Sequence, residues 1–271
     1  MSEKFSIELG NVQTTLLLPL WGRAVESQKK KPLLIDKTAL EIISKIDYDF
    51  STIAENIKEL SQLAWIIRSI RTDNAIKYFL EKNPKATIVN IGCGLDTTFF
   101  RIDNGKLQWI DLDLPDVIEL RRKFIDDNKR MRCISSSFLD EEWFNDLSKN
   151  EPIMFLAGGV LYYFEAEQVK TFFKKISDIF PGSEICFDAT SPYGVAVANK
   201  LVIQNSGLDE KSFLKWGLKS IDEIIGWDNR IKVLKYEPLF EKSKKGFSLK
   251  NKITAIISDH YKIMSWVHLK L

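Results

Sequence analysis

The residues whose types and spacing best suit chemistry form one short turn, Asn90-Ile91-Gly92-Cys93-Gly94-Leu95-Asp96-Thr97. It follows Thr87–Ile91, a run rich in β-branched residues that predicts a strand. Gly92 and Gly94 let the backbone turn tightly and approach a ligand where a Cβ atom would interfere. We include Cys93 in the same ligand-binding turn.

An acidic residue follows at the distance that nucleoside binding needs. Asp113 lies nineteen residues after Gly94, beyond a second predicted strand at 107–110, and a carboxylate there accepts hydrogen bonds from ribose hydroxyl groups. Asp111 is the neighbouring alternative. A tight turn with no ligand is the simpler explanation, but the strand–turn–acid spacing favours a nucleoside site.

The turn also indicates which nucleoside. A dinucleotide site would place a third glycine at Thr97, for close packing over a pyrophosphate. A carboxylate at Asp96 would repel a pyrophosphate, whereas it could cap the following helix or face an ammonium group. S-adenosylmethionine carries an ammonium group and no phosphate, so we predict it as the cofactor.

Bulk properties limit the kind of protein that carries this turn. The chain has 271 residues, 45% apolar and 28% charged, with a net charge of +2. That size suits one large domain or a domain with an extension, and that charge gives no support for nucleic-acid binding. No apolar run is long enough to span a bilayer, and three scattered cysteines form no metal or disulfide pattern. We therefore expect a cytoplasmic protein without a metal site.

The elements around the turn alternate between strands and helices. After Asn83-Pro84, strands are predicted at 87–91, 107–110, 132–135, 153–156, 184–187, 231–236 and 263–269, and helices at 115–127, 141–147 and 165–180. This alternation predicts a mainly parallel sheet with an antiparallel edge. Residues 1–83 form a helical extension, and 84–271 form the catalytic domain. Residues 191–228 interrupt the domain as a lid, with short helices at 196–203, 210–216 and 220–226.

One cation in the extension stands out. Apolar residues at 57, 60, 64 and 67 form a stripe on one helix face, and Arg71 is the next position on it. A cation that ends an apolar stripe suggests a specific partner, although a surface arginine is the alternative. Arg68 points elsewhere and is expected to be solvated.

The chain resembles a known family, the leucine carboxyl methyltransferases, in the branch of the polyketide carboxyl O-methyltransferases. The resemblance covers about residues 14–190. The motifs that carry it are Val89–Thr97, Asp111–Ile118, Leu20–Ser27 with Asp36, Arg71-Thr72-Asp73 and Gly158–Phe164. It implies a class I S-adenosylmethionine-dependent methyltransferase, with a Rossmann-like sheet whose last strand is antiparallel, a helical N-terminal extension and a helical lid.

The resemblance also implies roles for single residues. Arg71 would bind the methionine carboxylate and Asp113 the ribose. Two positions depart from the family pattern. Ser137-Phe138 stands where an Asp-Leu pair often contacts adenine, so the serine hydroxyl, a backbone N–H and the phenyl ring would take over. Gly158 stands where a glutamate is usual, and would let the backbone approach the cofactor.

The acceptor is expected to be an oxygen of a small, polyketide-like carboxylic acid. A carboxylate, with a pKa of about 4, is already ionised at neutral pH and needs no general base, whereas a phenol does. The chain has only two histidines, which mildly favours the carboxylate. Arg23 is the candidate for guiding an anionic acceptor, with a structural ion pair as the alternative. Tyr162 or Tyr163 borders the acceptor unless it is core packing.

Two other functions stay open at this point. One is an NAD(P)-dependent oxidoreductase, against which the missing third glycine and the lack of a Tyr-x-x-x-Lys pair argue. The other is a non-catalytic S-adenosylmethionine-binding protein, which Ser137 and Gly158 keep open. Trp216 and Trp227 of the lid are candidates to line the acceptor pocket. The sequence specifies neither the acceptor nor the oligomeric state.

Overall fold

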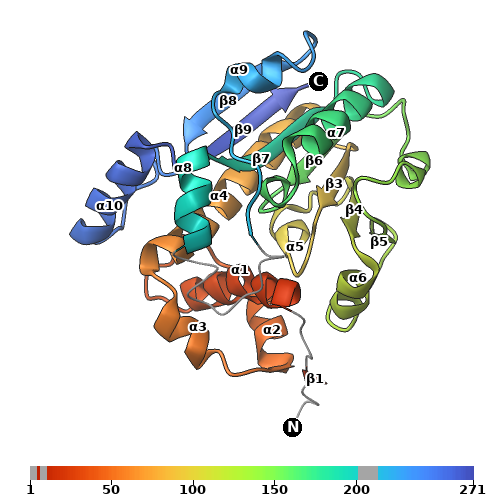
Figure 1. The fold of residues 1–271 in the computed structure, drawn as a ribbon. Coiled ribbons are helices and arrows are strands. Elements are labelled where there is room, and N and C mark those ends of the chain that lie inside the picture. The colour runs from red at the N-terminus through yellow and green to blue at the C-terminus, as the bar shows by residue number, and fades with distance from the viewer. Residues whose placement is uncertain (1–4, 7–10, 201–212) are drawn as a thin grey trace.

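The computed structural model describes residues 5–6, 11–200 and 213–271. Its centre is a seven-stranded sheet (Figure 1). The strands are β3 (Thr87–Ile91), β4 (Gln108–Asp113), β5 (Met131–Ser135), β6 (Ile153–Ala157), β7 (Glu184–Thr190), β8 (Lys232–Pro238) and β9 (Met264–Lys270). All seven were predicted from the sequence to within a few residues at their ends.

The sheet has the order β5-β4-β3-β6-β7-β9-β8. The strands β5, β4, β3, β6 and β7 pair in parallel, and β9 runs antiparallel to both of its neighbours, β7 and β8. This confirms the mainly parallel sheet with an antiparallel last strand. From β3 the chain first adds β4 and β5 on one side, and then returns to add β6 and β7 on the other side. In open α/β sheets, ligands bind at such a switch point, here between β3 and β6.

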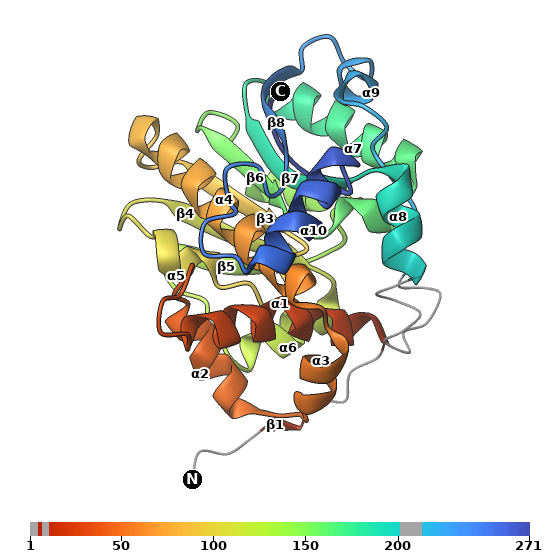
Figure 2. The ribbon, with the colours of Figure 1, turned by 90° about the vertical axis from the view of Figure 1, so that its left-hand side faces the viewer.

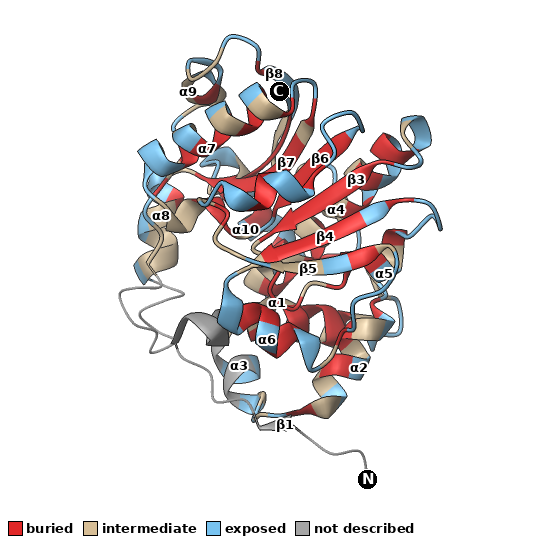
Figure 3. Cartoon of the chain, turned by 90° about the vertical axis from the view of Figure 1, so that its right-hand side faces the viewer, coloured by how far each residue is buried: buried red, intermediate tan, exposed pale blue. Residues whose placement is uncertain are grey.

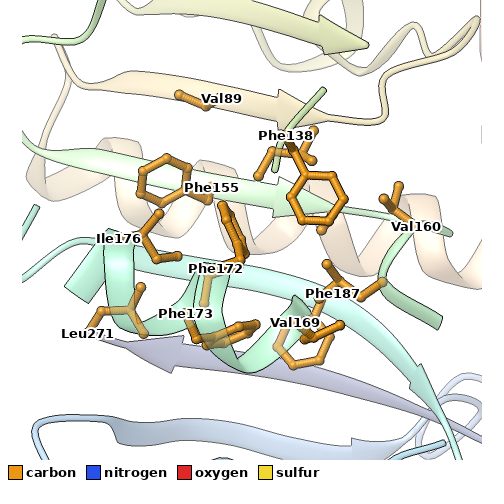
Figure 4. Packing of buried hydrophobic residues seen from close by; sticks show 14 of the residues in the cluster. Val89, Phe138, Phe155, Val160, Val169, Phe172, Phe173, Ile176, Phe187 and Leu271 are labelled. Carbon is orange, nitrogen blue, oxygen red and sulfur yellow. The ribbon is translucent and has the colours of Figure 1, made fainter. Parts of the chain in front are cut away.

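Helices cover both faces of the sheet because alternate strand residues point to opposite sides. On β6, Ile153, Phe155 and Ala157 join one apolar cluster, whereas Met154 and Leu156 join another. The first cluster includes residues of η1 (Glu142–Asp146) and α7 (Ala166–Ile179). Phe172 and Phe173 of α7 lie beside Phe155 and Phe187 of the sheet (Figure 4). The second lies under α4 (Glu59–Lys82), α5 (Thr98–Ile102) and α6 (Pro115–Arg122). In Figure 3 the central strands are coloured largely as buried, as are parts of the helices around them.

The N-terminal region is helical. Besides α4 it contains α1 (Asn11–Ser27), α2 (Lys37–Lys45) and α3 (Ser51–Asn56), and α1 packs against both α2 and α4 (Figure 2). Two short parallel strands, β1 (Phe5–Ser6) and β2 (Ile46–Asp47), were not expected. None of the described helices combines the length and apolarity that crossing a membrane requires.

The segment after β7 differs in part from expectation. It contains α8 (Pro192–Ala198) and α9 (Ile221–Ile225), close to two of the three predicted helices. The helix predicted at 210–216 is wrong in its described part, since residues 213–219 are not helical. The amides of Lys215 and Trp216 instead donate to the carbonyl of Tyr162. Residues 201–203 and 210–212 lie outside the described part. The last helix, α10 (Leu249–His260), joins β8 to β9.

Candidate active site

The glycine turn joins β3 to α5 and requires its glycines. Gly92 and Gly94 have φ angles of 60° and 47°, in the left-handed region. A Cβ atom on Gly92 would lie 2.4 Å from a methyl carbon of Val160, and one on Gly94 would lie 2.9 Å from Leu16 of α1. The turn is thus enclosed by the segment that follows β6 and by α1. Cys93, between the glycines, is buried.

Asp113 meets this turn from the end of β4. Its carboxylate accepts hydrogen bonds from the amides of Gly94 and Leu114, both at 2.8 Å. Among the described residues no cationic side chain forms an ion pair with it. Burial raises the pKa of Asp113 above its ordinary value, although both amides oppose that rise. A carboxylate with unused lone pairs and no paired cation suits neutral hydroxyl donors such as those of a ribose.

A buried arginine holds the turn from behind. Arg121 donates to the carbonyls of Gly94 (3.0 Å) and Asp96 (2.7 Å), and to the carboxylate of Asp111 (2.7 Å). Asp111 also accepts from the side-chain amide nitrogen, Nδ2, of Asn90 at 3.0 Å. Asp111, the alternative ribose ligand, is therefore fully buried in a structural ion pair.

Arg23 of α1 binds another carbonyl of the same turn. It donates to the carbonyl of Leu95 (3.0 Å) and forms an ion pair with Asp36 (2.9 Å). The same Asp36 oxygen accepts from Thr97 and Arg101, so the network ties α1 and α5 together. Arg23 is 4% exposed. These contacts correspond to the structural ion pair rather than to guidance of an acceptor, because the side chain is committed to the turn.

Asp96 supports the first turn of α5. Its carboxylate accepts from the amide and the hydroxyl group of Thr98, at 3.0 and 3.1 Å, although the N-cap position of α5 is Thr97 and not Asp96. Burial acts to raise the pKa of Asp96, but Arg23 and Arg101 outweigh it, so the pKa lies below its ordinary value. Asp96 is therefore a carboxylate that stays ionised beside the turn.

A second polar cluster lies at the carboxyl ends of β6 and β7. Arg68 of α4 pairs with Asp188 at 3.0 Å, and Asp188 also accepts from the Gly159 amide at 2.6 Å. The Tyr162 hydroxyl group also interacts electrostatically with Arg68. The expectation that Arg68 is solvated is wrong, because its side chain is only 12% exposed. Its guanidinium rests on Gly159, where a Cβ atom would lie 2.7 Å from Nη1.

Arg71 lies away from both clusters. It donates to the carbonyls of Leu239, Pro238 and Glu241, and it pairs with Glu237 at 2.9 Å. These partners are at and beyond the end of β8, the edge strand of the sheet. Arg71 is therefore not an ordinary surface arginine, and its described partners belong to the chain itself. We therefore do not retain Arg71 as the candidate for the methionine carboxylate.

Tyr162 borders the second cluster and the lid. Burial raises the pKa of its hydroxyl group well above the usual value, with the nearby charge of Asp188 acting in the same direction. Burial likewise raises the pKa of Tyr163 to about 12. Because both phenols keep their protons at neutral pH, neither is suited to act as a general base there.

The two departures from the family pattern lie at the same edge of the sheet. Ser137 follows β5, and its hydroxyl accepts from the Leu139 amide at 3.2 Å. Phe138 is buried and packs edge-on against Phe164 and Phe172. Gly158 directly follows β6 and is exposed. Phe138 is therefore part of the core, whereas Gly158 offers free backbone.

Sequence reasoning missed Arg68, Asp188 and Arg121 as a group. Each interrupts an apolar pattern. Asp188 stands in the strand Ile185–Ala189, which is otherwise apolar, and Arg121 continues the helix face of Val117. Arg68 follows Leu60 and Ala64 at spacings of four, a stripe as regular as the one that ended at Arg71. A charged residue at a position where the apolar pattern predicts burial is the signal that could have identified all three.

The arrangement fits a nucleoside with a zwitterionic tail. One end offers the Asp113 carboxylate, which has no ion-pair partner among the described residues, and the turn of Gly92–Gly94; the other offers the cation Arg68 beside exposed Gly158 backbone. Asp96, which stays ionised, follows the glycine turn directly and precedes α5. The order of the strands and the antiparallel last strand are those of the class I S-adenosylmethionine-dependent methyltransferase fold.

Comparison with known proteins gives the family. Residues 17–177 match the model of the leucine carboxyl methyltransferases, and this chain belongs to that family. The tetracenomycin polyketide synthesis O-methyltransferase TcmP of Streptomyces glaucescens is 32% identical over 194 residues, 71% of each chain. The S-adenosyl-L-methionine-dependent methyltransferase dpfgK of Gibberella zeae is 30% identical over 206 residues, 69% of each. S-adenosylmethionine is thus the cofactor.

Solved structures agree at the level of the fold. A DUF574 family protein of Streptomyces avermitilis superimposes with a TM-score of 0.58 at 10% identity, covering 92% of this chain and 96% of that one. The plantazolicin methyltransferase BpumL, crystallised with S-adenosylhomocysteine, gives 0.51 at 13% identity, covering 96% and 99%. At these identities the likeness concerns architecture, and it confirms the predicted fold class.

Proposed function

We propose that this protein transfers a methyl group to a carboxylate oxygen of a small, polyketide-like acid. The observation that carries the proposal is the second polar cluster. Its ionisable groups are Arg68, Asp188, Tyr162 and Tyr163; the first two are paired, and both phenols have a raised pKa. His268 pairs with Glu184 at the opposite end of β7, and His260 lies on α10. Because the described residues of this cluster offer no histidine, and its phenols keep their protons at neutral pH, an acceptor that is already anionic fits best.

The residues would divide the work as follows. Asp113 would accept the ribose hydroxyls, and the Gly92–Gly94 turn would let the backbone lie against the cofactor. Arg68, rather than Arg71, would face the methionine carboxylate, with Asp188 fixing its orientation. Ionised Asp96 suits the ammonium group. Arg23 is a positioning residue, since it acts through the carbonyl of Leu95.

The bound cofactor supplies an electrophilic methyl carbon, so the protein contributes placement and electrostatics. Aligning an ionised acceptor in a site that excludes water lowers the barrier without proton transfer. The segment at 213–219 is suited to exclude water, because its backbone is hydrogen bonded to Tyr162. Trp216 is buried and packs with Trp227, the ring centroids being 5.8 Å apart. We propose that these rings border a bulky apolar acceptor, as suits the polyketide named for TcmP.

The test is incubation with methyl-labelled S-adenosylmethionine and matched panels of aromatic acids and phenols of similar size. Methyl esters are cleaved by mild alkali and methyl ethers are not, so alkali lability of the labelled product identifies the acceptor oxygen. We expect alkali-labile products from the acids. Alkali-stable products from the phenols alone would overturn the carboxylate proposal. Tight cofactor binding with no turnover across both panels would favour the non-catalytic alternative.

A further inference from the structure

Helix α10 (Leu249–His260) is turned inside out relative to an ordinary surface helix. Its buried residues are the small or polar Asn251, Ala255 and Ser258. Four aliphatic side chains point to solvent, with exposed fractions between 50% and 75%; they are Leu249, Ile253, Ile256 and Ile257. We call these four the outer face of α10. Amphipathic helices of globular domains bury such a face, so its exposure calls for a partner.

The fold of α10 does not depend on this face. Ala255 joins the apolar cluster that includes Phe240 and Phe247. Asp259 accepts from the Phe240 amide at 3.0 Å, and Ser248 caps the first turn through the Asn251 amide. The helix is thereby fixed to the body through its inner side, leaving the aliphatic stripe available for something else.

The charge around the stripe is one-sided. Residues 242–262 contain six lysines and a single acidic residue, Asp259, which pairs with Lys244. In helical projection, exposed Lys250 borders the outer face beside Ile257, and exposed Lys252 borders it beside Ile256. Basic residues therefore flank the apolar stripe on both sides. This is the pattern of helices that lie in the plane of a membrane surface.

Two tyrosines extend the stripe toward the lid. Tyr261 continues the stripe one turn beyond Ile257. The centroid of its ring lies 5.9 Å from the ring centroid of Tyr193. Both side chains are 58% exposed. Tyrosine rings favour the boundary between lipid and water because they combine an apolar ring with a hydroxyl group.

We propose that α10 is an interfacial anchor that rests the enzyme on an anionic lipid surface. The outer face would enter the acyl-chain boundary, and the flanking lysines would meet the acidic head groups. A helix that lies on a membrane does not have to cross it. In Figure 1 α10 lies at the left margin of the molecule. A fluid lipid surface can enclose such an exposed helix without a preformed groove.

A second copy of the chain fits these observations less well. A two-fold contact would bring the same lysines together with no exposed acid on α10 to offset them. Four aliphatic side chains of one short helix also fall short of the about 800 Å² per partner of a standard interface. An acidic protein would complement the charge of the lysines, but it would need a groove that fits the exposed helix.

The test is co-sedimentation of the full chain with vesicles of phosphatidylcholine alone or with about one third phosphatidylglycerol. We expect binding to the mixed vesicles only, weakened by salt. Ile253→Glu/Ile257→Glu should lower the partition coefficient at least tenfold, whereas the matched pair Ile225→Glu/Leu234→Glu, also exposed, should not. Lys250→Glu/Lys252→Glu should lose about fivefold for each lysine, with Lys30→Glu/Lys31→Glu as the control of equal net charge.

Three results would overturn the proposal. The first is no binding to the mixed vesicles, and the second is equal loss in the control pairs. The third is a dimer, detected by sedimentation velocity without lipid, that Ile253→Glu/Ile257→Glu turns into a monomer, because the partner would then be a second copy. Stabilisation by S-adenosylhomocysteine, measured on every variant, establishes that each one is folded.

Discussion

At the scale of single residues, Arg68 and Asp188 are the pair whose roles can be separated. Arg68→Met leaves Asp188, whose side chain is fully buried, without its cation. We expect a loss of about 3–5 kcal/mol in unfolding free energy. The double variant Arg68→Met/Asp188→Asn should recover most of that stability, because the uncompensated charge is gone. Urea unfolding measures both.

Cofactor affinity of the same variants decides what Arg68 contacts. If Arg68 faces the methionine carboxylate, both variants should bind S-adenosylhomocysteine at least tenfold more weakly, whether or not stability is restored. Arg71→Met is the matched control and should lower stability alone, because Arg71 contacts Glu237 and the backbone beyond it. Recovery of affinity together with stability would mean that Arg68 acts only as a structural ion pair.

Tyr162 makes a prediction about pH. Burial and Asp188 raise its pKa above the usual 10, so the phenol stays protonated as pH rises from 7 to 10. The rate of methyl transfer should therefore not increase over that range. A general base contributes about 10²–10⁴-fold, so Tyr162→Phe should cost less than tenfold in kcat and act mainly on KM. Rate profiles against pH for both proteins test this, and a loss of a hundredfold would contradict it.

Residue roles were the least predictable part of the site. The spacing of Gly94 and Asp113 was enough to expect contact between them, and the structure brings them within 2.8 Å. Helix periodicity could not choose between Arg68 and Arg71, because the two lie one turn apart on the same helix. Their partners, Asp188 and Glu237, come from strands more than a hundred residues later. Only the order of the strands in the sheet determines which arginine meets which acid.

At the scale of elements, the β3–α5 turn gives a prediction about packing. Gly92→Ala must place a Cβ atom 2.4 Å from Val160 and hold alanine at a φ of 60°. Gly105→Ala isolates the backbone cost, about 1–2 kcal/mol, because Gly105 has a φ of 76° and no atom within 4 Å of its Cβ position. We expect Gly92→Ala to cost clearly more and to weaken cofactor binding.

A second substitution checks the cause. Val160→Ala, combined with Gly92→Ala, should restore part of the lost stability by removing the methyl group in contact. Chemical unfolding of the parent chain, each single variant and the double variant measures this. Equal costs for Gly92→Ala and Gly105→Ala would mean that the segment after β6 yields to the new side chain. The turn would then tolerate more than its geometry suggests.

Elements were predicted well where one pattern dominates. The strands at 87–91 and 153–157 are apolar runs between turn signals, and parallel pairing buries both faces. The helix expected at 210–216 failed in its described part because the amides of Lys215 and Trp216 bond to Tyr162. A contact made across more than fifty residues overrode the local pattern. Helical spacing places Leu249, Ile253, Ile256 and Ile257 on one face of α10, but periodicity alone does not show whether that face is buried or exposed.

At the scale of the whole molecule, the cofactor should stabilise the fold as a unit. Its proposed ligands come from the carboxyl ends of separate strands and from α4, so binding joins elements that are distant in the chain. At a concentration of a hundred times Kd, S-adenosylhomocysteine should add about 2.7 kcal/mol. Thermal unfolding should shift upward by about 5–10 °C. NADH, used as the comparison, should give no shift; a preferential shift with NADH would contradict the cofactor assignment.

The position of β9 has a consequence for the order in which the sheet can be completed. β8 has β9 as its sole neighbour among the described strands, and β9 follows it in the chain, after α10. β8 therefore cannot join the sheet until residues 264–270 have been synthesised and have paired with β7. We expect a nascent chain that stops before β9 to keep β7 as an open edge, available to other chains. In translation, this half of the sheet is the last to become safe from aggregation.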